Sequence, residues 1–179
     1  MKRVILIAAT LVVTTAAADA ARATEVGSSR RIGFGLQIIE PTAAIGKVYL
    51  DRNRAIDFGF GFWGYGRCYD AGHGNRYCND YYAAYSLHLD FLFEDTIVEN
   101  VVRLSWHVGL GGRTQFGNKY YFDDRYHRLG MFARVPVGLD LAFRRPEFLE
   151  VYLEVAPGTW LYPGLTFDID VGLGVRAYF

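Results

Sequence analysis

The chain has 179 residues, with 19 Lys and Arg against 19 Asp and Glu, and its 13 Tyr and 13 Phe give it an unusually aromatic composition. A balanced charge argues against the basic surface that nucleic-acid-binding proteins carry, so no nucleic-acid partner is expected. The length fits one domain.

Residues 1–23 have the pattern of a secretory signal peptide. Lys2 and Arg3 precede an apolar run over residues 4–18, and Ala21-Arg22-Ala23 supplies a cleavage site of the small-x-small type. A single transmembrane helix is the alternative, but the run is shorter than the ~20 residues that a span needs. We therefore predict one exported domain over residues 24–179.

The rest of the chain alternates apolar with polar or glycine residues, as β-strands do. The clearest segment ends the chain: apolar residues alternate from Phe167 to Phe179, over a length that crosses a tilted bilayer. Pro136 cannot donate a ladder hydrogen bond, so we expect a break there. Eight strands are predicted, at residues 31–39, 44–50, 56–63, 81–93, 101–116, 128–143, 148–156 and 165–179.

The connections between these strands differ in length at the two ends. Outer-membrane barrels have short periplasmic turns and longer outer loops, with aromatic girdles near both rims. We place Trp160 and Tyr162 in the outer girdle. Periplasmic turns are predicted at residues 51–54, 94–100 and 144–147, and outer loops at residues 64–80, 117–127 and 157–164.

Cys68 and Cys78 both fall in the predicted outer loop 64–80. An exported chain meets an oxidising compartment, so we predict a disulfide that closes this loop. An unpaired or metal-binding pair is the alternative.

Alternation alone does not decide which face is inside. A membrane barrel with an apolar outside and a lipocalin-like soluble barrel with an apolar inside both satisfy it. The glycine positions favour the membrane barrel, because glycine weakens solvent-facing strands but makes room for neighbouring side chains inside a narrow barrel. Nine glycines share the charged face: Gly33, Gly35, Gly59, Gly61, Gly109, Gly111, Gly138, Gly172 and Gly174.

The predicted interior is therefore charged and filled. Eight strands leave space only for side chains, and charges removed from water must be paired. We predict an internal salt-bridge network, with a proton or ion path as the alternative. Its members are Lys47, Asp57, His88, Asp90, Arg103, His107, Arg113, Arg134, Asp140, Glu150, Glu154, Asp168, Asp170 and Arg176.

Five stretches carry a resemblance to a known family: GFGLQIIEPTAAIGKVYLDRNRAIDFGFG, HVGLGGRTQFG, RLGMFARVPVGLDLAF, FLEVYLEVAPG and FDIDVGLGVRAYF. The chain resembles the small OmpA-like outer-membrane barrels, and more closely an uncharacterised bacterial family of eight-stranded barrels. The resemblance implies insertion into the outer membrane of a Gram-negative bacterium. The barrel assembly machinery would recognise the final strand, with Phe179 as the end of the assembly signal.

Two serine–histidine pairs raise the question of catalysis, since Ser86 and His88, and Ser105 and His107, lie two residues apart on one strand face. Both pairs alternate inward among charges, away from any lipid substrate. The polar loop residues match no metal-ligand spacing. No catalytic, cofactor or metal site is predicted.

These observations predict an all-β, eight-stranded antiparallel up-and-down transmembrane β-barrel in the bacterial outer membrane. It is expected to be a monomer with a plugged polar lumen, surrounded by outer-membrane lipids. Its role would be structural, or its outer loops would bind an extracellular ligand or host protein. A lipocalin-like soluble carrier and a membrane-embedded lipid-modifying enzyme are the alternatives.

Overall fold

The computed structural model describes residues 25–63, 68–70, 76–78, 85–122 and 125–179. The predicted signal peptide lies outside these ranges. Within them, no helix has the length and apolar character needed to cross a membrane.

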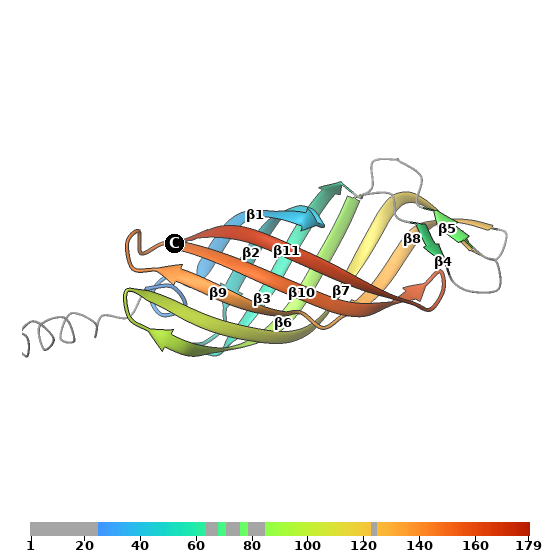
Figure 1. Cartoon of the computed structure of the whole chain (residues 1–179). Coiled ribbons are helices and arrows are strands. Elements are labelled where there is room, and N and C mark those ends of the chain that lie inside the picture. Colours follow the sequence, from blue (N-terminus) through green and yellow to red (C-terminus); the bar gives the residue numbers. More distant parts are fainter. Residues whose placement is uncertain (1–24, 64–67, 71–75, 79–84, 123–124) are drawn as a thin grey trace, which may run out of the picture.

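Nine strands form one antiparallel sheet that closes into a ring, because β11 pairs with both β10 and β1. The predicted all-β, up-and-down sheet is confirmed (Figure 1). The ring strands are β1 (Ile32–Glu40), β2 (Thr42–Tyr49), β3 (Arg54–Trp63), β6 (Tyr85–Glu99), β7 (Val102–Phe122), β8 (Arg125–Arg134), β9 (Val137–Phe143), β10 (Leu149–Tyr162) and β11 (Thr166–Tyr178). A separate pair consists of β4 (Cys68–Asp70) and β5 (Arg76–Cys78).

The predicted sixth strand is interrupted at Pro136, as expected from its missing N–H. β8 and β9 lie one after the other between β7 and β10, and each pairs with both. The Val135 N–H donates to Pro157 O (2.9 Å) and the Gly109 N–H donates to Pro136 O (2.8 Å). The neighbouring strands thus hold the chain in place across the break.

The two ends of the ring are distinct (Figure 1). The terminal end contains residues 25–30, Phe179 and the β2–β3, β6–β7 and β9–β10 turns; the hairpin end contains β4 and β5. Three predicted connections, 94–100, 117–127 and 157–164, are largely wrong, because β6 extends to Glu99, β7 to Phe122 and β10 to Tyr162. Backbone ladders continue past the apolar part of these strands, since hydrogen bonding between paired strands does not require an apolar face.

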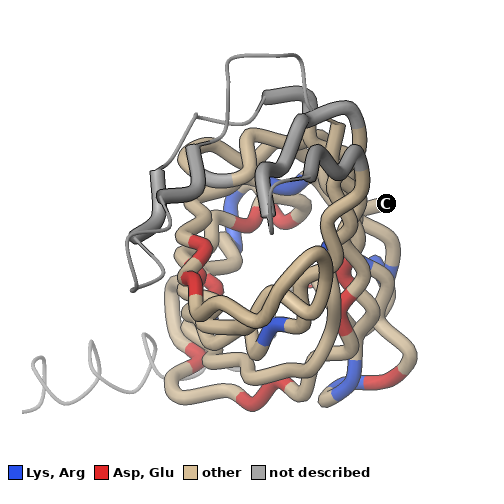
Figure 2. The backbone as a smooth tube through the Cα atoms, turned by 90° about the vertical axis from the view of Figure 1, so that its right-hand side faces the viewer, with Lys and Arg blue, Asp and Glu red and all other residues tan. Residues whose placement is uncertain are grey.

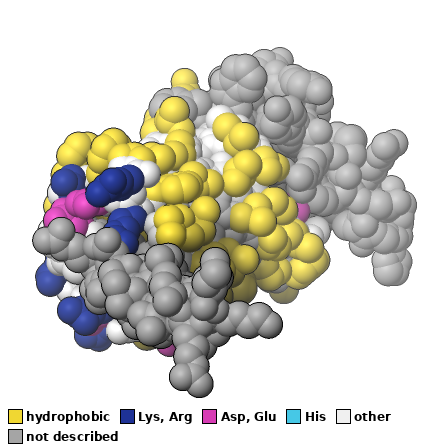
Figure 3. All heavy atoms as spheres, turned by 60° about the vertical axis from the view of Figure 1, so that its left-hand side comes forward, with side chains coloured by type: hydrophobic (Ala, Val, Ile, Leu, Met, Phe, Trp, Pro, Cys, Tyr) yellow, Lys and Arg dark blue, Asp and Glu magenta, His cyan; other side chains and the backbone are white. Residues whose placement is uncertain are grey.

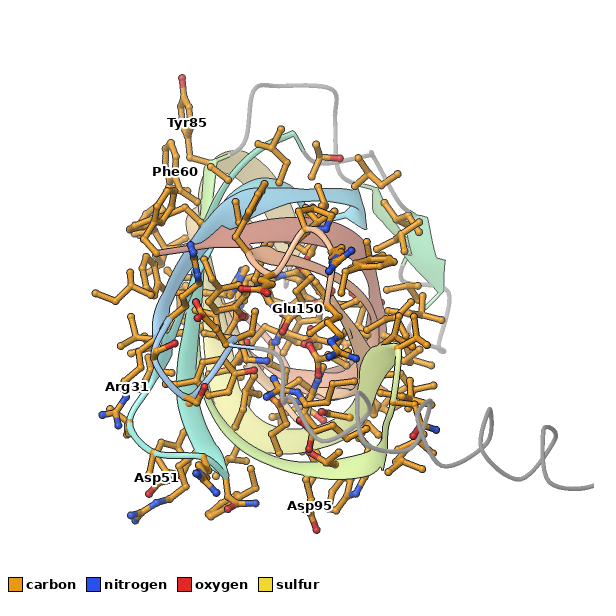
Figure 4. All side chains as sticks on the ribbon, turned by 90° about the vertical axis from the view of Figure 1, so that its left-hand side faces the viewer. Arg31, Asp51, Phe60, Tyr85, Asp95 and Glu150 are labelled. Atoms are coloured by element: carbon orange, nitrogen blue, oxygen red, sulfur yellow. The ribbon has the colours of Figure 1, made fainter. Side chains whose placement is uncertain are left out.

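The faces of the ring have the orientation predicted from the glycine pattern. Leu36, Leu89 and Leu110 are 64%, 62% and 69% exposed, whereas Lys47 and Glu150 are fully buried. Hydrophobic side chains cover much of the visible wall, and charged side chains gather toward one end (Figure 3). Seen along the ring, Glu150 points into the interior, while Phe60 and Tyr85 point outward (Figure 4).

Residues 25–30 close the terminal end, although the sequence showed no pattern there. The Val26 carbonyl accepts a hydrogen bond from Arg103 Nη1 (2.6 Å), and Arg30 Nη1 donates to Tyr178 O (3.3 Å). Gly27 turns the chain with a φ of +78°. Val26 is fully buried in an apolar cluster with Tyr49, Ala55, Leu92, Ala142 and Tyr178. We call Val26 and these five residues the terminal cap.

The β2–β3 turn at the same end is held by charged side chains. The Asp51 carboxylate accepts hydrogen bonds from Arg54 Nε (2.6 Å) and from the Asn53 N–H (2.9 Å). These bonds, the one from Arg54 above all, lower the pKa of Asp51 below its ordinary value. The turn therefore keeps its ion pair down to acidic pH.

The terminal cap gives a first prediction. Val26→Ala should lower the free energy of unfolding by about 1.5–3 kcal/mol, because two buried methyl groups are removed and a small cavity remains. Val101→Ala is the matched control, since Val101 is 78% exposed in the β6–β7 turn; its effect should stay within about 0.5 kcal/mol. Denaturant unfolding followed by circular dichroism measures both, and equal effects would show that residues 25–30 are not packed into the ring.

Candidate functional site

The interior holds the charged side chains that the sequence placed on the inward face. Thirteen of the fourteen predicted residues are buried, and Arg103 is half-buried with 13% of its side chain exposed. They come from every ring strand except β1, and charged positions recur around the tube in the end view (Figure 2). We call these fourteen residues together with Glu94 the interior network.

Lys47 is the centre of the network nearest the terminal cap. Its Nζ lies 2.6 Å from Glu94 Oε2, 3.3 Å from Asp140 Oδ1 and 3.8 Å from Glu150 Oε1. The Tyr49 hydroxyl donates to Glu94 Oε2 (2.8 Å), so a cap residue also stabilises the network. Each carboxylate thus has a donor despite its removal from water.

Sequence reasoning missed Glu94, because it placed this residue in a turn. The structure buries Glu94 against Lys47, and Arg103 Nη2 approaches its other oxygen at 3.6 Å. The missed signal is the alternation itself: Glu94 continues the inward series that runs through His88 and Asp90.

Two arginines connect the middle of the network, and each contacts three carboxylates. Arg134 lies 2.5 Å from Glu154, 2.9 Å from Asp90 and 3.1 Å from Asp170.

Arg176 pairs with Asp57 and lies 3.0 Å from Glu150 and 3.7 Å from Asp140. Its guanidinium also stacks over the Tyr152 ring, 3.8 Å from the centroid. A guanidinium suits such shared sites because its donors point in several directions within one plane.

His107 is enclosed by acids on both sides. Its Nδ1 is hydrogen-bonded to Asp140, and its Nε2 lies 3.3 Å from Glu154 Oε2. Both ring nitrogens therefore face carboxylates, an arrangement that a doubly protonated imidazole satisfies with two donors. It leaves no lone pair to accept the proton of Ser105, whose hydroxyl has no hydrogen-bond partner among the described residues.

The network ends in an aromatic layer near the hairpin end. Arg113 pairs with Asp170 at 2.7 Å and lies over the adjacent rings of Phe132 and Trp160, 5.1 and 5.2 Å from their centroids. The Trp160 indole N–H donates to Asp168 Oδ2 (3.2 Å). The predicted place of Trp160 in an outer girdle is therefore wrong, because β10 extends through it and turns its ring inward.

Inward glycines make the space that these side chains occupy. Gly59, Gly111 and Gly138 stand directly opposite His88, Asp90 and His107 on neighbouring strands. A Cβ at these glycines would lie 2.3, 2.0 and 2.5 Å from those side chains, closer than any tolerated contact. The glycine pattern and the charge pattern are thus two parts of one packing arrangement.

With the fold and the network described, the sequence can be placed among known families. It matches the family described as "Protein of unknown function (DUF3996)" over residues 23–166. The chain belongs to this family. The match ends at Thr166, the first residue of β11, so Asp168, Asp170 and Arg176 lie beyond it. No curated protein matches the chain.

The two cysteines of this DUF3996 protein meet in the short β4–β5 sheet. Cys68 and Cys78 are direct cross-strand partners in its register. The disulfide between them stays a prediction, which comparing the mass of the purified chain before and after reduction and alkylation would decide.

The glycine packing gives a second prediction. Gly111→Ala should lower the free energy of unfolding by about 1–3 kcal/mol, because the new methyl group would collide with the Asp90 carboxylate and the β6 backbone. Gly112→Ala is the matched control, because the nearest atom to its Cβ is Phe132 O at 3.2 Å. Denaturant unfolding of both variants measures the difference, and an equal or larger effect of Gly112→Ala would contradict the packing account.

Proposed function

We propose that this DUF3996 protein is an integral outer-membrane β-barrel with a filled polar interior. One observation carries the proposal: large apolar side chains are exposed on every ring strand except β2, while fourteen of the fifteen charged side chains of the interior network are buried. In water this arrangement would expose a continuous apolar surface and bury charge, both of which are unfavourable. In a bilayer the same wall faces hydrocarbon.

The strand count supports a narrow membrane barrel. β8 and β9 occupy a single position in the ring, so the nine strands correspond to eight barrel strands, one of them broken at Pro136. Barrels of eight strands have an interior that side chains fill.

Strand length agrees with a bilayer span. A tilted transmembrane strand needs about 9–11 residues. β6, β10 and β11 have 15, 14 and 13 residues, and β1 and β3 have 9 and 10. With short turns at the terminal end, we assign that end to the periplasm and the hairpin end to the outside.

The interior network also bears on the alternatives. A lipocalin-like carrier needs an apolar cavity lining, whereas ion pairs fill the middle of this ring. A lipid-modifying enzyme would need a base beside Ser105, and both nitrogens of His107 face carboxylates. We assign the protein a structural role in the membrane, with β4–β5 at the outer end as the segment available to an extracellular ligand or host protein.

Lipid exposure of the wall can be tested with one substitution at two depths. Leu110→Arg should lower the free energy of unfolding in lipid vesicles by about 2–4 kcal/mol, and Val101→Arg at the rim by about 0–1 kcal/mol. Both residues are strongly exposed, at 69% and 78%. A water-soluble protein would tolerate both equally, so equal small effects, with folding in the absence of detergent or lipid, would refute the membrane proposal.

A filled interior predicts a closed barrel. The purified chain inserted into planar bilayers should show no stable conductance step, because ion pairs occupy the ring from the terminal cap to the aromatic layer. Flotation of the same preparation with lipid vesicles establishes that the protein has inserted. A reproducible open channel would contradict the filled interior.

A further inference from the structure

We propose that the interior binds one divalent transition-metal cation through Asp57, His88 and Asp90. One ligand atom from each of these buried residues lies within 4.8 Å of the other two. Asp57 and Asp90 are direct cross-strand partners on β3 and β6, and His88 shares the inward face of β6 with Asp90. The set forms only through the β3–β6 register, which explains why residue spacing gave no signal.

Two buried atoms of this set have no partner of their own. His88 Nδ1 and Asp90 Oδ1 are shielded from solvent and make no hydrogen bond within the described residues. His88 and Asp90 are only 5% and 1% exposed. Buried polar atoms without a partner are rare in proteins, and a bound ion is one of the arrangements that satisfies them.

The neighbouring arginines leave the ligand oxygens available. Arg176 contacts Asp57 through Oδ2 and Arg134 contacts Asp90 through Oδ2. The Oδ1 atom of Asp57 is hydrogen-bonded inside the ligand set itself, to His88 Nε2 at 3.3 Å, and not to either arginine. Since each arginine is shared among three carboxylates, neither can neutralise this aspartate pair alone.

The charge balance of the interior favours a dication. Eight carboxylates of the network face the side chains of Lys47 and four arginines, and His107 adds one positive charge through its two acid contacts. With every carboxylate ionised, two negative charges remain within the interior network. One divalent cation, with His88 as a neutral ligand, neutralises them.

The packing around the site gives these ligands room. His88 lies over Gly59 and Asp90 lies over Gly111, at distances that a Cβ would not allow. One imidazole nitrogen and two carboxylate oxygens form a donor set that suits Zn²⁺, with bonds of about 2.0–2.2 Å. Ca²⁺ takes 6–8 oxygen ligands, which these three residues do not supply.

The test uses the full mature chain in detergent micelles, refolded with Zn²⁺ and then desalted. Native mass spectrometry should show one bound Zn²⁺ per chain, with a higher melting temperature than the chelator-treated protein. Asp90→Asn and His88→Gln should each weaken Zn²⁺ binding at least tenfold, while Ca²⁺ should not bind.

Asp168→Asn is the matched control, because it also removes one buried negative charge but its carboxylate bonds to Trp160 elsewhere in the network. Its Zn²⁺ affinity should stay within about threefold of wild type. Circular dichroism checks that each variant folds. If His88→Gln fails to fold, the Zn²⁺ affinity of the isosteric Asp90→Asn variant is the deciding measurement. Absence of bound Zn²⁺ in the wild type, or equal losses in Asp90→Asn and Asp168→Asn, would overturn the proposal.

Discussion

The structure depends on the pairing of charges inside a closed ring. Arg134 draws carboxylates from β6, β10 and β11 together, and Arg176 does the same for β3, β9 and β10. Removing one partner from a buried ion pair leaves an uncompensated charge and typically costs 3–5 kcal/mol. The network therefore favours one closed arrangement of strands over alternatives that separate these residues.

This pairing also restricts register and composition. A slip of one residue would turn the charged face outward and the apolar face inward on any strand. Glycine opposite His88, Asp90 and His107 adds a steric condition, because the register must place a strand position without a side chain beside each of them. The ion pairs and the inward glycines therefore favour the same strand register.

Much of this arrangement could be predicted from the sequence, because it follows from period-two alternation. The ring strands, the inward face and the break at Pro136 are all local features. The ion-pair partners could not be predicted from the sequence, since Arg176 and Asp57 are 119 residues apart and meet only when the ring closes. The burial of Val26 was not predicted, because residues 25–30 show no periodicity. The inward positions of Glu94 and Trp160 were not predicted, because the strand ladders extend past the apolar segments.

The central claim is that one strand face contacts lipid while the other packs inside. Leu89 and Leu92 test it on a single strand, β6, because they are 62% and 0% exposed. Nuclear Overhauser contacts measured in lipid nanodiscs should link Leu89 methyl groups to acyl chains and Leu92 methyl groups to Val26. Acyl contacts at Leu92, or water contacts in place of lipid at Leu89, would contradict the account.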